Sequence, residues 1–109
     1  MAVTGKTWQA KATTSQAAII PALSAGQEIW ITHFRVVNSS GANCYFKAWA
    51  DYDGTTWDVT TIVWPQQTFA SNKIISDAGL IILGAGGSFA IQAEANDSIT
   101  VHLAGILRT

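Results

Sequence analysis

Glu28-Ile29-Trp30-Ile31-Thr32-His33-Phe34-Arg35-Val36-Val37-Asn38 is the stretch that decides the fold. Branched and aromatic residues recur at every second position, which predicts a long strand over residues 28–38. Strict alternation gives two faces, one with Trp30, Phe34 and Val36, the other with Ile29, Ile31, His33, Arg35 and Val37. Because the second face mixes polar and apolar side chains, we expect it to be partly exposed or to lie at an interface.

Shorter runs of the same kind follow, separated by residues that favour turns. We expect strands over residues 43–51, 56–64, 74–75, 80–83, 88–94 and 98–107. Asp53-Gly54 predicts a tight hairpin, and Pro65 is expected to end the strand before it. Asp77-Ala78-Gly79, Gly84-Ala85-Gly86-Gly87 and Asn96-Asp97 mark further turns.

Seven or eight short strands with no competing helical window predict an all-β domain, a single antiparallel β-sandwich over residues 19–109. An eight-stranded jelly roll is favoured over an immunoglobulin-like sandwich, because the chain lacks the Cys and Trp spacing of the latter. Residues 1–18 are expected to form an extended N-terminal arm with Trp8 as its anchor on a neighbouring subunit. An edge strand over residues 6–13 and a frayed terminus are the alternatives.

The chain is poor in charge for its length. Of its 109 residues 49% are hydrophobic and 12% charged, and five are Trp, whereas about a quarter of a typical domain is charged. Protein interfaces are depleted in Lys and Glu and enriched in aromatic residues. We therefore expect part of the surface to be covered by other copies in a homo-oligomer; a monomer with a neutral polar surface is the alternative.

Several partners are not expected. The net charge is −1 with no basic cluster, which disfavours nucleic-acid binding. The apolar run at residues 79–84 is too short to span a membrane. The first residues show no charged region followed by an apolar one, so no secretory signal is expected.

Catalytic and metal-binding motifs are also missing from the sequence. His33, His102 and Cys44 are the candidates for chemistry. We interpret Cys44 as a small buried hydrophobic residue; a dyad with His33 and a zinc ion shared across a symmetry axis are the alternatives. No catalytic residue, metal or cofactor is expected.

Asp51, Asp53 and Asp58 lie close together around the predicted hairpin. Clustered carboxylates on a loop supply the oxygen ligands that Ca²⁺ prefers. The calcium-loop pattern is broken because Ile62 occupies its twelfth position, where an acidic residue is needed. A hairpin turn is therefore the favoured interpretation, with a calcium or sugar loop as the alternative.

Aromatic residues gather around the same hairpin, at Tyr45, Trp49, Tyr52, Trp57 and Trp64. Together with Trp8, four of them (Tyr45, Trp49, Trp57 and Trp64) are our candidates for a protein interface. Tyr45 and Trp49 share a predicted face, so a platform on which sugar rings stack is the alternative. The second functional hypothesis is accordingly a carbohydrate-binding module or a receptor-binding knob.

Three segments carry a resemblance to a known group. They are Ile20–Gly41, the hairpin Asp53-Gly54-Thr55-Thr56-Trp57, and the closing segments Leu80–Leu83 and Asn96–Gly105. With them the chain resembles the small jelly-roll-like β-sandwich virion proteins of tailed bacteriophages, although Gly86-Gly87-Ser88 replaces the acidic turn common there.

The resemblance implies a non-enzymatic virion component, at the capsid surface, a vertex, the neck or the tail. It implies homo-oligomerisation, with a trimer as the first guess. A larger virion protein, such as the major capsid or tail protein, is the implied partner.

Overall fold

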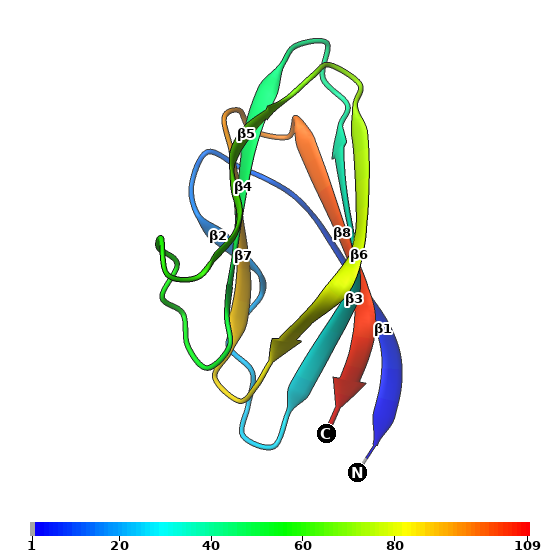
Figure 1. The fold of residues 1–109 in the computed structure, drawn as a ribbon, viewed down its shortest axis with the longest axis vertical. Helices are drawn as coiled ribbons and strands as arrows, with labels where there is room; N and C mark the ends of the chain where they lie inside the picture. The colour runs from blue at the N-terminus through cyan, green and yellow to red at the C-terminus, as the bar shows by residue number, and fades with distance from the viewer. Residues whose placement is uncertain (1) are drawn as a thin grey trace.

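The computed structural model describes residues 2–109, which form eight β-strands and no membrane-spanning helix. The strands are β1 (Val3–Lys11), β2 (Ala17–Ile20), β3 (Glu28–Asn38), β4 (Cys44–Asp51), β5 (Ile62–Phe69), β6 (Ile74–Leu83), β7 (Ser88–Ala93) and β8 (Ile99–Arg108). Sheet A has the strand order β1-β8-β3-β6 and sheet B the order β2-β7-β4-β5, and the two pack face to face (Figure 1). Two four-stranded antiparallel sheets in this order make a jelly roll, so the predicted fold is confirmed.

Five aromatic rings join the two sheets at the centre of the sandwich. Phe34 of sheet A lies 5.5–6.1 Å, between ring centroids, from Phe46, Trp64 and Phe89 of sheet B. Phe69 packs against both Phe46 and Trp64. Tilted and edge-on ring pairs at these separations are favourable beyond the area they bury, so this cluster helps to hold the two sheets together.

Strand β3 has the predicted bounds, and the faces of residues 33–37 are as predicted, but residues 29–31 were assigned to the wrong faces. A β-bulge at Thr32 shifts the register between Ile31 and His33 against β8. One extra residue reverses the alternation from that point. Ile29 and Ile31 therefore enter the same core as Phe34 and Val36, whereas Trp30 does not, and His33 and Arg35 are exposed.

Strand β6 is continuous where the sequence predicted a turn at Asp77-Ala78-Gly79. Ile31 pairs with Ile81 and His33 with Ala78, so two residues of β6 lie opposite Thr32 alone. This second bulge accommodates Gly79 without ending the strand. The separate strands expected at residues 74–75 and 80–83 are thus one strand at the edge of sheet A.

The β4–β5 connection is longer than the predicted hairpin. Strand β5 begins at Ile62 rather than at Thr56, and residues 52–61 form a loop. Pro65 lies inside β5 instead of ending it. It is tolerated because β5 is an edge strand and its pairing with β4 shifts register at this point.

The N-terminal segment runs along the edge of sheet A. Val3–Lys11 pairs with β8 over its whole length as strand β1. Trp8 is half-buried and packs against the core of its own chain, and Ala12, just after the strand, is fully buried. In this structure residues 3–11 therefore form an edge strand of sheet A.

Asn38 is a fully buried polar residue at the end of β3. Its Nδ2 donates hydrogen bonds to the carbonyl oxygens of Phe69 and Ala70, and its Oδ1 accepts one from the Ser40 N–H. The side chain thereby joins the β3–β4 turn to the β5–β6 turn.

Asn38→Ala should lower the free energy of unfolding by about 2–3 kcal/mol, because it leaves these buried backbone groups without partners. Urea denaturation measures the change. Ser39→Ala, at an exposed position of the same turn, is the control and should have little effect. Equal stabilities of the two variants would contradict this role of Asn38.

Candidate interaction surfaces

The β4–β5 loop, residues 52–61, covers the outer face of sheet B (Figure 1). Trp49 and Ala90 point to this face yet are only 4% and 0% exposed. Trp57 Nε1 donates a hydrogen bond to Ser88 Oγ (2.9 Å), which donates to the Gly54 carbonyl oxygen (2.7 Å). These bonds fasten the loop to β7 on the face of sheet B to which the buried Trp49 ring points.

The aromatic candidates are consequently distributed over different environments. Tyr45 and Trp49 share the outer face, as predicted, but stacking of a sugar needs an exposed ring face, and Trp49 offers none in this structure. The Lys47 ammonium lies 5.7 Å from the centre of the Tyr45 ring. Trp57 fastens the loop and Trp64 belongs to the aromatic cluster of the core.

The three aspartates of the loop do not converge. Asp51 is 9% exposed, and its carboxylate accepts hydrogen bonds from the Thr56 N–H (2.9 Å) and the Asp53 N–H (3.4 Å). Asp53 and Asp58 are exposed. Within residues 2–109 no three His, Cys, Asp or Glu side chains are grouped so that they could hold a metal ion. Asp51 therefore organises the loop through backbone N–H groups.

Asp51→Ala should loosen the loop and lower the free energy of unfolding by about 2 kcal/mol, the usual value of hydrogen bonds to a charged group. Trp49 would then gain access to water, which a red shift of tryptophan fluorescence detects. The exposed Asp53 provides the control, because Asp53→Ala removes no such acceptor. An unshifted spectrum in Asp51→Ala would contradict this role.

Cys44, His33 and His102 are placed apart. Cys44 is 2% exposed and faces the core from sheet B. His33 and His102 belong to sheet A and lie outside the core cluster, and His33 is exposed. A dyad of Cys44 with His33 is therefore not formed.

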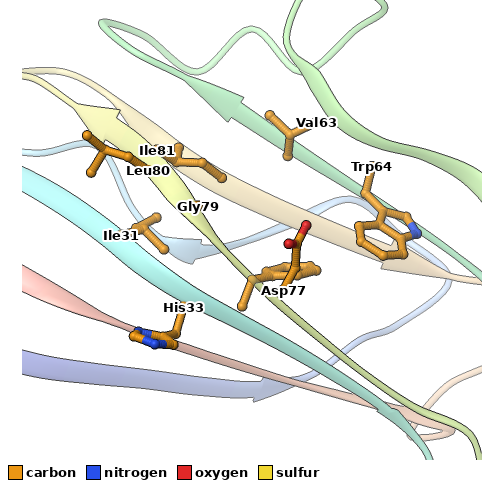
Figure 2. A pocket seen from close by; sticks show the side chains of 9 residues that line it. Ile31, His33, Val63, Trp64, Asp77, Gly79, Leu80 and Ile81 are labelled. Atoms are coloured by element: carbon orange, nitrogen blue, oxygen red, sulfur yellow. The ribbon is translucent and has the colours of Figure 1, made fainter.

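One side of the sandwich is open, where edge strands β5 and β6 of different sheets face each other without pairing. A cavity of about 150 Å³ lies between them (Figure 2). We call this surface the open side and define it by five of the lining residues, Val63, Trp64, Asp77, Leu80 and Ile81. Val63 and Leu80 are large apolar residues that are 42% and 59% exposed.

Besides His33, two residues with polar groups line this mostly apolar cavity. Asp77 lies opposite the buried Phe34 in register, so its side chain is turned toward the inner side of sheet A and the cavity (Figure 2). Trp64 Nε1 is buried and has no hydrogen-bond partner among residues 2–109. The sequence does not predict the open side, because residues 77–79 have the composition of a turn whereas an edge strand runs through them.

No protein-family model and no curated protein matches this chain. Solved structures match its fold. The chain is similar over 100% of its length to 89% of a chain in the acid-stable capsid of the Helicobacter pylori bacteriophage KHP30, with a TM-score of 0.56 and 13% identity.

Two further structures have comparable similarity. A chain of the disulfide-linked pili that form Bacillus endospore appendages has a TM-score of 0.54 and 17% identity, over 99% of this chain and 87% of that one. A chain of the T13 particle of the virus IBDV has a TM-score of 0.54 and 9% identity; the match covers 96% of this chain but 30% of the viral one. At such identities these likenesses establish a common jelly-roll fold.

Proposed function

We propose that this chain is a non-enzymatic structural protein of a tailed-phage particle. It associates with copies of itself and attaches to a larger virion protein, such as the major capsid or tail protein. Its place in the particle is the capsid surface, a vertex, the neck or the tail. The sequence resemblance to phage virion proteins supports this proposal, and so does the fold shared with a phage capsid chain.

The open side is the observation that carries the proposal. Val63 and Leu80 expose apolar surface on two neighbouring edge strands whose outer backbone groups are unpaired. Soluble proteins normally protect such edges, and contiguous apolar patches mark contact sites. Asp77 is the only charged residue in the lining of this cavity. We assign this surface to contacts between copies, with three chains around a common axis.

The distribution of reactive side chains supports a structural role. Cys44 is enclosed in the core, whereas His33 lies on the outside of the opposite sheet. Catalysis requires a nucleophile, acid or base held against a partner. The Cys44 thiol and the His33 imidazole are not held against each other.

The assignment to a particle is tested on virions purified from cultures of the bacterium that carries the gene. Mass spectrometry of banded particles should find peptides of this chain in constant ratio to the major capsid protein. An antibody against the chain should label the same particles in electron micrographs. Recovery of the chain only from the particle-free fraction would contradict the proposal.

A further inference from the structure

We propose a second contact between copies, in which the outer face of sheet A binds the tip of the β4–β5 loop of the next copy. The tip is the part of the loop around Asp58 and Val59. This inference rests on the proposed self-association and concerns surfaces other than the open side.

A row of hydrogen-bond donors crosses the outer face of sheet A. Gln9 of β1, His102 of β8, Arg35 of β3 and Ser76 of β6 lie side by side in register. They point outward because their neighbours Leu103 and Phe34 enter the core. Arg35 is exposed, and its Nε donates to Ser76 Oγ at 3.4 Å.

A hollow of about 430 Å³ adjoins this row. In the next row Ala104 lies between Thr7 and His33, and its small side chain leaves space that a larger residue would fill. The lining combines the apolar Trp8, Phe34, Leu103 and Ala104 with polar side chains on the outer face, among which Arg35 is a cation and Thr7, Gln9, His33, Ser76 and His102 are the others. Asp77 is the one carboxylate in the lining, and its side chain is turned toward the open side. The hollow thus suits an anionic group with a small apolar neighbour.

The tip of the β4–β5 loop has this chemistry. Asp58 is exposed, and the next residue, Val59, is 86% exposed, more than any other large hydrophobic side chain of residues 2–109. Asp53 adds a second exposed carboxylate to the loop. Lys47 is the cation on the outer face of sheet B, and its ammonium lies over the Tyr45 ring.

Hydrogen bonds hold the tip in one conformation. Asp58 Oδ1 accepts from the Thr60 N–H (2.8 Å) and the Thr60 hydroxyl (2.6 Å), and Thr61 Oγ1 donates to the Thr56 carbonyl oxygen (2.6 Å). The hydrogen bonds from Thr60 lower the pKa of Asp58 below its ordinary value, so this carboxylate stays charged. A tip ordered before binding loses less conformational entropy when it docks.

The two surfaces lie on opposite sides of the sandwich. Figure 1 shows the loop beyond sheet B, on the side away from sheet A. A chain therefore cannot pair its own loop with its own face, but copies stacked in one orientation can. The Arg35 guanidinium would then donate to Asp58 while Val59 lies over Ala104. Such a contact joins unlike surfaces, so it builds a ring or a filament.

Charge reversal tests the contact in the full-length chain. Light scattering at low salt should show wild-type species larger than the open-side oligomer, and these should dissociate as salt screens the charges. Arg35→Glu alone and Asp58→Arg alone should each raise the concentration needed for these species by about tenfold or more, because like charges then meet. An equimolar mixture should assemble again, since each chain supplies the surface that complements the other.

Two further variants separate contact from folding. Lys73→Glu makes the same charge change as Arg35→Glu at an exposed turn, and it should assemble as the wild type does. Val59→Lys keeps the hydrogen bonds of Asp58 and should still prevent assembly of the larger species.

Single variants that assemble normally, or a mixture that fails to assemble, would overturn the face-to-loop contact and leave the open-side oligomer standing. A wild-type chain that is monomeric under every condition would overturn both proposals. The two failures are therefore distinguishable.

Discussion

Leu80→Asp is expected, at a salt concentration that dissociates the face-to-loop contact, to convert the self-associated protein into monomers, with self-association weakened by about 30-fold or more. Leu80 is 59% exposed on the open side, where an interface would bury it. A carboxylate placed there loses hydration and gains no partner. A charge that an interface buries without a partner costs about 2 kcal/mol or more, and each 1.4 kcal/mol is tenfold in affinity.

The matched control is Val3→Asp. Val3 is also a large apolar residue, 63% exposed, but it lies on β1 at the other edge of sheet A. Light scattering gives the mass of each variant, and circular dichroism verifies that both are folded. A folded Leu80→Asp variant with the wild-type mass would show that the open side is not the contact between copies.

Phe46→Ala should lower the free energy of unfolding by about 3–5 kcal/mol, the usual cost of removing a buried phenyl ring. Phe46 is fully buried and its ring contacts Phe34, Trp64 and Phe69. Its loss would leave a cavity where the two sheets meet. Against a typical total of 5–15 kcal/mol, this variant should be close to unfolding at room temperature.

Thermal and urea denaturation measure this effect. Phe46→Leu, which retains most of the apolar volume, should lose only part of that stability. If Phe46→Ala lost less than about 1 kcal/mol, the aromatic cluster would not be the contact that joins the sheets.

Much of the fold follows from the sequence because turn chemistry and alternation are local properties. The bounds of β3 were predicted correctly, and the last two strands were predicted to within two residues at each end. Gly86 and Asp97 have positive φ values of 79° and 63°, as tight turns require, and both lie in predicted turns. Such signals need no knowledge of distant residues.

The errors arise where one strand depends on another. The bulges of β3 and β6 are produced by pairing among three strands, and they change which side chains face the core. Asp77-Ala78-Gly79 has turn composition, but its place at a sheet edge makes it part of a strand. The strand end predicted at Pro65 is wrong for the same reason, because an edge strand such as β5 can contain proline.

The surfaces were harder to predict than the strands. The sequence indicated an aromatic contact region around Trp49 but not that its ring is buried or that a ten-residue loop lies on the same face of sheet B. The open side depends on which strands lie at the edges, and only the topology shows this. The low charge of the chain did predict that part of its surface contacts other protein chains.

Sedimentation equilibrium of the wild-type chain tests the central claim most directly. If copies cover one another's open sides, the mass at micromolar concentration should be a multiple of the 11.6 kDa chain, with three chains as the proposed number. A mass of one chain, maintained up to millimolar concentration, would contradict the account.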